Sequence, residues 1–177
     1  TETDETGAVT THGYDQWGNR VSSTDFLGRI TTYSYNGAGQ VLSQTDPAGV
    51  VTTNTYDLRG RLLTQTVGGL TTTMTYLFTG LLASAQQPSG YQVNYQYDGA
   101  HRLIAWSDNR GNSGSYALDG MGNRTAEQTK DAQGQLAFEL SRSINAINRV
   151  ASETVGGNQS ASYTYDANGD LFGTANG

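Results

Sequence analysis

The sequence predicts an all-β fold, a curled strip of tandem antiparallel β-hairpins. Three observations predict it. A phrase that reads Tyr-Asp-Leu-Arg-Gly-Arg-Leu at residues 56–62 recurs along the chain at steps of 20 or 21 residues, and once at 26. Each copy contains a tight-turn signal, and polar and apolar residues alternate on both sides of it. A fixed period of this size indicates a repeat array.

The repeats are counted from the position that opens the phrase, which is usually Tyr. The eight positions are Tyr14, Tyr35, Tyr56, Tyr76, Tyr97, Leu118, Ile144 and Tyr165. Eight copies in register predict one repeat array over residues 1–177, without an internal domain boundary. Because the sequence begins at Thr1 in what looks like the middle of a repeat, we expect the array to be a piece of a larger chain.

The second position of the phrase is a turn anchor. A short carboxylate or amide there can accept hydrogen bonds from the amides that follow. The anchors are Asp15, Asn36, Asp57, Asp98, Asp119, Asn145 and Asp166, and the fourth copy has Leu77 instead.

Three residues after the anchor comes a slot for a residue with positive φ. Its occupants are Gly18, Gly39, Gly60, Gly80, His101, Gly122, Asn148 and Gly169. Glycine reaches positive φ at little steric cost, and His and Asn visit this region more readily than most residues. We therefore interpret His101 as a turn residue and not as a catalytic base or a ligand.

Strands flank each turn. Tyr91, Val93, Tyr95 and Tyr97 lie two apart, which places them on one face of a strand. Apolar residues such as Val41, Leu62 and Leu103 begin the returning strand. Further turn signals connect one hairpin to the next: residues 46–49, 68–69, 88–90, 108–111, 131–134 and 156–158.

This pattern predicts sixteen strands. Residues 1–13 supply one strand, and the 26-residue step places an extended hairpin or link within residues 130–141. A sheet of sixteen strands curls under the twist of neighbouring strands. One face would carry the Tyr and Leu stripes, packed on cargo, on another part of the strip or on glycans.

The amino-acid composition excludes or disfavours several kinds of fold and function. The chain is 35% hydrophobic and 15% charged, with 23 Gly and no Cys, which disfavours a helical or α/β core and excludes thiol chemistry. A net charge of −6 disfavours a nucleic-acid surface. No apolar run is long enough to span a membrane, so we expect no membrane insertion by this segment.

The repeated phrase is similar to the repeat of a known protein family. The Tyr-Asp-x-x-Gly-Arg-Leu phrase at about 21-residue steps resembles the YD repeat of Rhs proteins, which is also found in Tc toxin B and C components, bacterial wall-associated proteins and teneurins. The resemblance covers nearly the whole chain. It implies a β-strip that spirals into a hollow shell, which in bacterial members encloses a variable C-terminal toxin domain.

The chain departs from the family pattern in two ways. Family members usually have many more than eight repeats, so this chain resembles an arc of a shell wall. The C-terminal core region that carries aspartate self-cleavage in many bacterial members has no match, because Asp46-Pro47-Ala48-Gly49 is an isolated linking turn.

No residue pattern predicts catalysis. Turn chemistry accounts for the aspartates, and neither His12 nor His101 lies near a nucleophile motif. Asp166, Asn168 and Asp170 match the start of a calcium loop, but Leu171 occupies the position that requires Gly. We expect no enzyme activity, no cofactor and no metal.

Two functions remain open. The first is a non-catalytic structural segment of an Rhs-type shell, secreted or at the bacterial cell surface, that encapsulates or presents a C-terminal toxin of the polymorphic class. Its partners would be the other repeats, the enclosed toxin and secretion-system components. The alternative is a cell-surface adhesion module that binds glycans or a protein partner through its aromatic strip.

Overall fold

The structure, a computed structural model, describes residues 1–176, which form seventeen β-strands and no helix. Consecutive strands are joined by short turns, and paired strands run antiparallel. The predicted all-β fold of tandem antiparallel hairpins is confirmed. Residues 1–176 contain no helix that is long and apolar enough to span a membrane.

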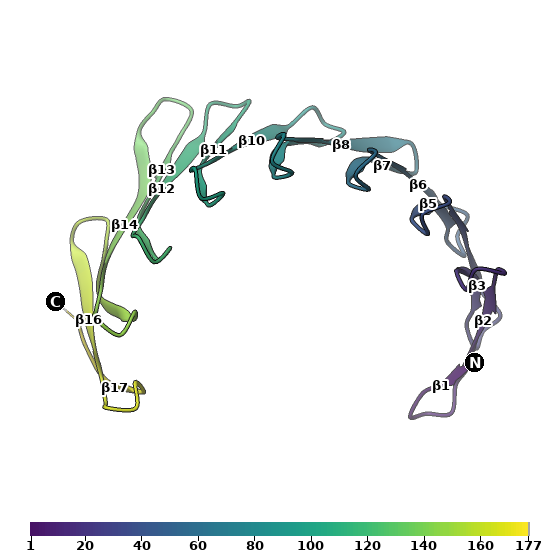
Figure 1. The fold of residues 1–177 in the computed structure, drawn as a ribbon, viewed down its shortest axis with the longest axis horizontal. Coiled ribbons are helices and arrows are strands. Elements are labelled where there is room, and N and C mark those ends of the chain that lie inside the picture. Colours follow the sequence, from purple (N-terminus) through teal and green to yellow (C-terminus); the bar gives the residue numbers. More distant parts are fainter. Residues whose placement is uncertain (177) are drawn as a thin grey trace. The chain divides into compact units, whose positions relative to one another are not determined.

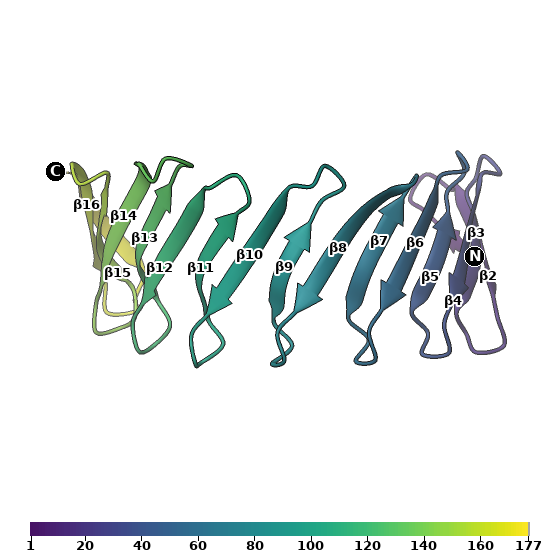
Figure 2. The same ribbon diagram turned by 90° about the horizontal axis from the view of Figure 1, so that it is seen from above.

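The chain divides into two compact units. One comprises Thr1–Thr75 with Ala85–Gly90, and the other comprises Tyr76–Ser84 with the chain from Tyr91 onward. Within each unit the strands lie side by side in chain order, and each strip is curved (Figures 1 and 2).

The first unit contains the early strands. They are β1 (Glu2–Thr3), β2 (Val9–Tyr14), β3 (Arg20–Thr24), β4 (Ile30–Tyr35), β5 (Val41–Thr45), β6 (Val51–Tyr56), β7 (Leu62–Val67) and most of β8 (Leu70–Tyr76). The second unit contains β10 (Gln92–Tyr97), β11 (Leu103–Asp108), β12 (Ser113–Leu118), β13 (Arg124–Lys130), β14 (Leu136–Ile144), β15 (Val150–Val155), β16 (Gln159–Tyr165) and β17 (Leu171–Asn176). Strand β9 (Leu82–Gln86) is shared between the units.

Seven of the hairpins formed by the Tyr-Asp phrase carry a β-bulge where the turn begins. In β6–β7, Thr55 lies opposite Thr64 but Tyr56 lies opposite Leu62, so the register shifts by one residue. A type I turn followed by a residue with positive φ produces this kind of bulge. The phrase therefore fixes both the turn and the register.

The two faces of the strip differ in chemistry. On one face, hydroxyl side chains pair across strands, as in Ser34–Ser43 at 2.6 Å and Thr55–Thr64 at 2.7 Å between their oxygen atoms. Exposed and half-buried residues alternate along β6, with Tyr56 among the half-buried ones. Leu140, 7% exposed, is the only buried large apolar side chain within residues 1–176. Backbone pairing, rather than a packed core, therefore holds these strands together.

The structure differs from the predicted number of strands but has the predicted long hairpin. The number sixteen is wrong, because the structure adds the two-residue strand β1, which pairs with β2 through the turn that begins at Asp4. Residues 1–13 thus contribute to two strands. The extra residues of the long repeat lengthen the β13–β14 hairpin, in which β14 has nine residues.

Candidate functional site

The Asp or Asn that opens each turn anchors it through one side-chain oxygen. In the clearest copy, Asp57 Oδ1 accepts hydrogen bonds from the backbone N–H groups of Arg59 at 2.8 Å and Arg61 at 3.0 Å. Gly60 N–H donates to Asp57 O at 2.9 Å and closes the backbone turn. The same two side-chain contacts recur at Asp15, Asn36, Asp98, Asp119, Asn145 and Asp166.

The slot three residues after the anchor has positive φ in every copy. His101 has a φ of 65° and Asn148 a φ of 63°, and these are the only residues other than Gly with positive φ in the described chain. The remaining slots are Gly18, Gly39, Gly60, Gly80, Gly122 and Gly169. His101 N–H donates to Asp98 O at 2.9 Å, so His101 lies within a turn.

Sequence reasoning missed that the linking turns at the opposite edge use the same chemistry. Asp25 Oδ1, for example, accepts from the amides of Leu27 and Arg29, both at 2.9 Å. The same contacts occur at Asp4, Asp46, Asp108 and Asp131. The Asp-x-x-Gly spacing at these sites was the signal that could have shown it.

A second missed feature is that, in four copies of the turn, the residue after the slot returns a hydrogen bond to the anchor. Arg61 Nε donates to Asp57 Oδ2 at 2.7 Å, and Asn123 Nδ2 donates to Asp119 Oδ2 at 2.8 Å. The Arg61 backbone N–H, followed by its guanidinium, holds the pKa of Asp57 below its ordinary value. At Asp119, the Asn123 side-chain amide is the largest cause of a lowered pKa. These two turns thus stabilise their carboxylates in the charged form.

The Tyr that opens the phrase joins its hairpin to the preceding one. Its hydroxyl donates to the backbone carbonyl fifteen residues earlier, at the start of the previous returning strand. The pairs are Tyr35 to Arg20 O at 2.8 Å, Tyr56 to Val41 O at 2.8 Å, Tyr97 to Leu82 O at 2.9 Å and Tyr165 to Val150 O at 2.8 Å. Phe would fill the same space but could not donate this bond, which explains why Tyr recurs.

Some copies depart from this scheme. Tyr14, in the first copy, is 59% exposed and meets the ring of His12 edge-on, with the ring centres 6.4 Å apart. The fourth copy keeps the backbone turn without a carboxylate, because Leu77 N–H donates to Leu81 O at 2.8 Å. Leu118 has no hydroxyl with which to reach the preceding hairpin.

Neighbouring turns also contact one another along the edge. Gln40 Nε2 donates to Gly60 O at 2.7 Å, and Arg102 Nη1 donates to Asp119 O at 2.8 Å. Asn123 Nδ2 donates to Asn148 Oδ1 at 2.5 Å, which brings the sixth and seventh turns together. These hydrogen bonds join the second turn to the third, the fifth to the sixth and the sixth to the seventh.

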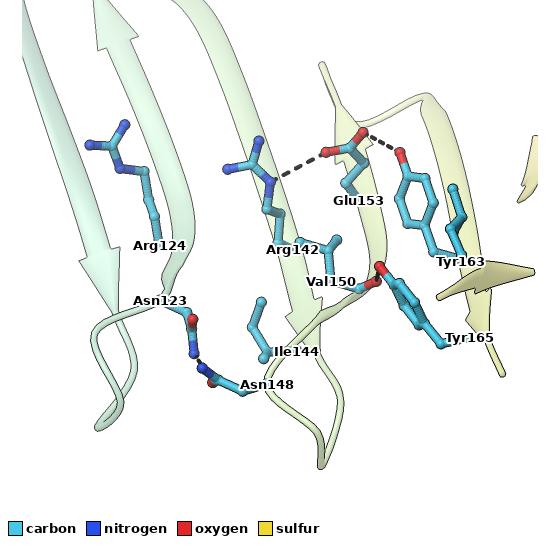
Figure 3. A pocket seen from close by; sticks show the side chains of 10 residues that line it. Asn123, Arg124, Arg142, Ile144, Asn148, Val150, Glu153, Tyr163 and Tyr165 are labelled. Atoms are coloured by element: carbon cyan, nitrogen blue, oxygen red, sulfur yellow. Dashed lines mark hydrogen bonds and ion pairs between the residues drawn. The ribbon is translucent and has the colours of Figure 1, made fainter. Parts of the chain in front are cut away.

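An open cavity of about 460 Å³ lies over β13–β17 in the second unit. Its apolar lining is Ile144, Val150 and Leu171, with the rings of Tyr163 and Tyr165 beside them (Figure 3). The two Asn side chains that join neighbouring turns line its lower rim (Figure 3).

A polar row crosses this cavity. Arg142 Nε lies 3.3 Å from Glu153 Oε2, and the Tyr163 hydroxyl donates to Glu153 Oε1 at 2.6 Å (Figure 3). The Tyr163 hydroxyl, with a further contribution from Arg142, lowers the pKa of Glu153. The same hydrogen bond raises the pKa of Tyr163. Glu153 is therefore held as a carboxylate between two donors.

Another cavity, of about 680 Å³, lies between the first two hairpins of the other unit. It is lined by Trp17, Asn19, Tyr33 and Tyr35 among others. Arg20 Nη2 lies 3.4 Å from the Tyr33 hydroxyl near this position. Both cavities lie beside Tyr side chains of the repeat, so this kind of cavity follows from the repeated hairpin structure. The row formed by Arg142, Glu153 and Tyr163, in contrast, occurs in the later hairpins.

Residues 1–176 contain no cluster of three or more His, Cys, Asp or Glu side chains able to hold a metal ion. Asp166, which begins the calcium-like pattern, uses Oδ1 to accept the amides of Asn168 and Asp170, both at 2.9 Å. These contacts make it a turn anchor like the others.

Comparisons with known proteins agree with this repeat geometry. A sequence profile of the teneurin YD-shell matches residues 1–126. No curated protein matches the chain. The crystal structure of TcdB2-TccC3-TEV is similar, with 16% sequence identity and a TM-score of 0.53, over 96% of this chain and 13% of the other. The structure of the Photorhabdus luminescens Tc holotoxin pore matches with 16% identity and a TM-score of 0.43, over 94% of this chain and 12% of the other.

This chain therefore spans about an eighth of the length of these matched chains. At that identity, the first match shows a shared fold. The profile covers well over half of the sequence, and it matches the stretch in which the turn anchors, the positive-φ slots and the Tyr hydroxyl contacts repeat. The chain belongs to the teneurin YD-shell family.

Proposed function

We propose that residues 1–177 form one repeat array that serves as a non-catalytic wall segment of an Rhs-type shell, and that this shell encloses or presents a C-terminal toxin or effector domain. The segment acts sterically, by keeping the enclosed domain from proteases and from the cell until release. The protein that carries it is secreted or displayed at a bacterial surface, and secretion-system components deliver it.

The observation that carries this proposal is that the stabilising contacts lie between neighbouring hairpins, whereas large apolar side chains stay exposed. Tyr hydroxyls tie several hairpins to the preceding one, and side chains of neighbouring turns tie others, as Tyr56 and Gln40 show. Large apolar residues remain exposed at the turns, among them Leu58 at 107% and Phe78 at 90%. Hydrogen bonds thus connect neighbouring hairpins, while large apolar side chains remain exposed to solvent. Such a strip suits a shell wall that other parts of a protein cover.

The proposal is tested by limited proteolysis of the full-length protein. One repeat, residues 36–56, is deleted, which removes a whole 21-residue period and preserves the alternation of strands and turns. We expect the enclosed C-terminal domain to be cleaved in the deletion protein and protected in the wild type. Equal protection in both would contradict an enclosing role for this segment.

A matched control separates enclosure from misfolding. Tyr95→Phe removes one hydroxyl that makes no hydrogen bond within residues 1–176, and it leaves every repeat in place. This variant should protect the C-terminal domain as well as the wild type does. Circular dichroism of both proteins should show the same β signal per residue.

A further inference from the structure

We propose that Asn36 is a site of spontaneous deamidation, in which water replaces the side-chain amide with a carboxylate and ammonia is released. The turn that Asn36 anchors promotes this reaction, because its backbone N–H groups stabilise the charge that develops on the side-chain oxygen. The modification goes beyond the role as a shell wall and does not depend on it.

The reaction consumes one water and proceeds through a succinimide. The Gly37 nitrogen attacks Asn36 Cγ, solvent takes the proton of that nitrogen, and the Cγ–Nδ2 bond breaks, so that Nδ2 leaves as ammonia with a proton returned by solvent. Water then adds to one carbonyl carbon of the ring and breaks the bond between that carbon and the Gly37 nitrogen. Addition at Cγ gives aspartate, and addition at the main-chain carbonyl carbon gives isoaspartate. The reacting atoms belong to adjacent residues, so the attack is intramolecular.

The first argument is the environment of the Asn36 side-chain oxygen. Asn36 Oδ1 accepts hydrogen bonds from the backbone N–H groups of Ala38 and Gln40, both at 3.0 Å. Attack on Cγ places negative charge on Oδ1, and these two donors already point at that atom. Preorganised backbone donors of this kind stabilise the intermediates of acyl transfer. The contacts that anchor the turn therefore also favour attack on the anchor.

The second argument is that the attacking nitrogen is free and unobstructed. The backbone turn is closed by Gly39 N–H, which donates to Asn36 O at 3.0 Å, while Gly37 N–H donates no hydrogen bond within residues 1–176. Gly37 is exposed, and a Cβ built on it would meet nothing within 4 Å. Because glycine also lacks a side chain of its own, both ring closure and the later attack by water are unhindered.

One contact opposes the reaction. Asn36 Nδ2 donates to Gln40 Oε1 at 2.9 Å, and this hydrogen bond is lost when ammonia leaves. It joins two neutral groups, whereas the two bonds to Oδ1 become charge-assisted during the attack and therefore stronger. The balance of these three contacts favours the reaction.

The aspartate product fits the turn. Asp15 and Asp119 anchor turns in which the residue after the slot is also an amide, and each carboxylate accepts from that amide at 2.8 Å. Gln40 can donate to an aspartate at position 36 in the same way. Deamidation to aspartate thus gives the second turn the carboxylate anchor that most copies of the phrase have.

Two other Asn residues of the chain serve as internal controls. Asn145 has the same oxygen environment, with Ile147 N–H at 3.1 Å and Arg149 N–H at 2.9 Å from its Oδ1, but the residue that follows it is Ala146. The Cβ of Ala146 hinders ring closure, so Asn145 isolates the effect of the glycine.

Asn168 has the opposite combination. It precedes Gly169, but Gly169 is buried and its N–H donates to Asp166 O at 3.0 Å. Within the part of the chain that the structure describes, the Asn168 side-chain oxygen accepts no hydrogen bond. The nitrogen is thus engaged and the developing charge has no donors, so Asn168 isolates the effect of the turn.

The test compares these sites in one sample. The purified protein is incubated at mildly alkaline pH, and peptide mapping by mass spectrometry follows the conversion of each Asn, with fragment ions to assign the residue and chromatography to separate aspartate from isoaspartate. Asn36 should convert about tenfold faster than either Asn145 or Asn168. Conversion of Asn36 no faster than that of Asn168 would overturn the proposal.

A parallel incubation in urea separates the turn from the dipeptide. In the unfolded chain Asn36 and Asn168 should convert at similar rates, because both precede glycine. Folding should slow Asn168 and should not slow Asn36. A rate at Asn36 that is higher in urea than in the folded protein would show that the turn protects this residue, and the proposal would then be wrong.

Gly37→Ala tests the attacking position. A Cβ has room there, so the fold should be retained, and conversion of Asn36 should slow about tenfold, toward the rate of Asn145. Gly99→Ala is the matched control, because Gly99 occupies the same position of the fifth turn and a Cβ on it also meets nothing within 4 Å. The control should leave the rate at Asn36 unchanged. Equal rates at Asn36 in the two variants would overturn the assignment, and circular dichroism should show the same β signal in both.

Discussion

Removal of one Tyr hydroxyl tests whether the hydrogen bonds between hairpins stabilise the strip. Tyr97 donates to Leu82 O at 2.9 Å, and burial is the main reason that its pKa is raised. Tyr97→Phe keeps the ring and leaves a carbonyl without this donor. A lost hydrogen bond of this kind costs about 1 kcal/mol, and in a repeat array the cost falls on the hairpins that share the contact.

Hydrogen exchange measures the effect locally. A loss of about 1 kcal/mol raises the population of the open state about fivefold, so amides of β10 and β11 should exchange about five times faster. Amides of β15 and β16 should keep their wild-type rates. Tyr95→Phe is the control, because Tyr95 lies on the same face of β10 and its hydroxyl makes no hydrogen bond within residues 1–176. Equal rates in the two variants would refute the idea that the hydroxyl matters.

Three further predictions concern the turns. His101 has a φ of 65°, so His101→Gly should relieve strain of up to about 1 kcal/mol and raise the thermal midpoint; a lower midpoint would contradict the strain argument. Hydrogen bonds lower the pKa of Asp57, so its stabilising effect is complete above the ordinary value of 3.8 and is lost as the pH falls through the lower folded value. Acid unfolding followed by circular dichroism should therefore begin below about pH 4, and Asp57→Asn should weaken the pH dependence. Both Gly60 and Gly18 have positive φ, but a Cβ at Gly60 would lie 3.0 Å from Gln40 Nε2 whereas one at Gly18 meets nothing within 4 Å. Gly60→Ala should therefore destabilise the chain by about 1 kcal/mol more than Gly18→Ala in urea unfolding, and equal losses would show that the contact between turns contributes nothing.

The sequence was sufficient for the fold class because the relevant interactions are local. An Asp accepts amides two and four residues ahead, and a residue with positive φ follows within the same turn, as in residues 57–61. Such contacts need no information from distant parts of the chain. The alternation of Tyr and polar residues then fixes which face each side chain occupies.

Three other features of the structure could not be predicted from the sequence. The hydrogen bond from Arg61 to Asp57 was missed because an Arg side chain in a hairpin can equally well extend into solvent without binding a neighbouring residue. The short strand β1 was missed because Glu2 and Thr3 carry no apolar pattern. The Arg142–Glu153–Tyr163 row was missed because its members are 11 and 10 residues apart and come from three strands.

The sequence by itself determined that this chain is a repeated series of antiparallel hairpins, since turn chemistry and strand alternation act over a few residues. Only the tertiary structure decided which atoms join one hairpin to the next. The Tyr56 hydroxyl reaches Val41 O, and Glu153 lies between Arg142 and Tyr163, because pairing and bulges set the register between strands. That register depends on geometry accumulated across several strands, which residue spacing alone does not specify.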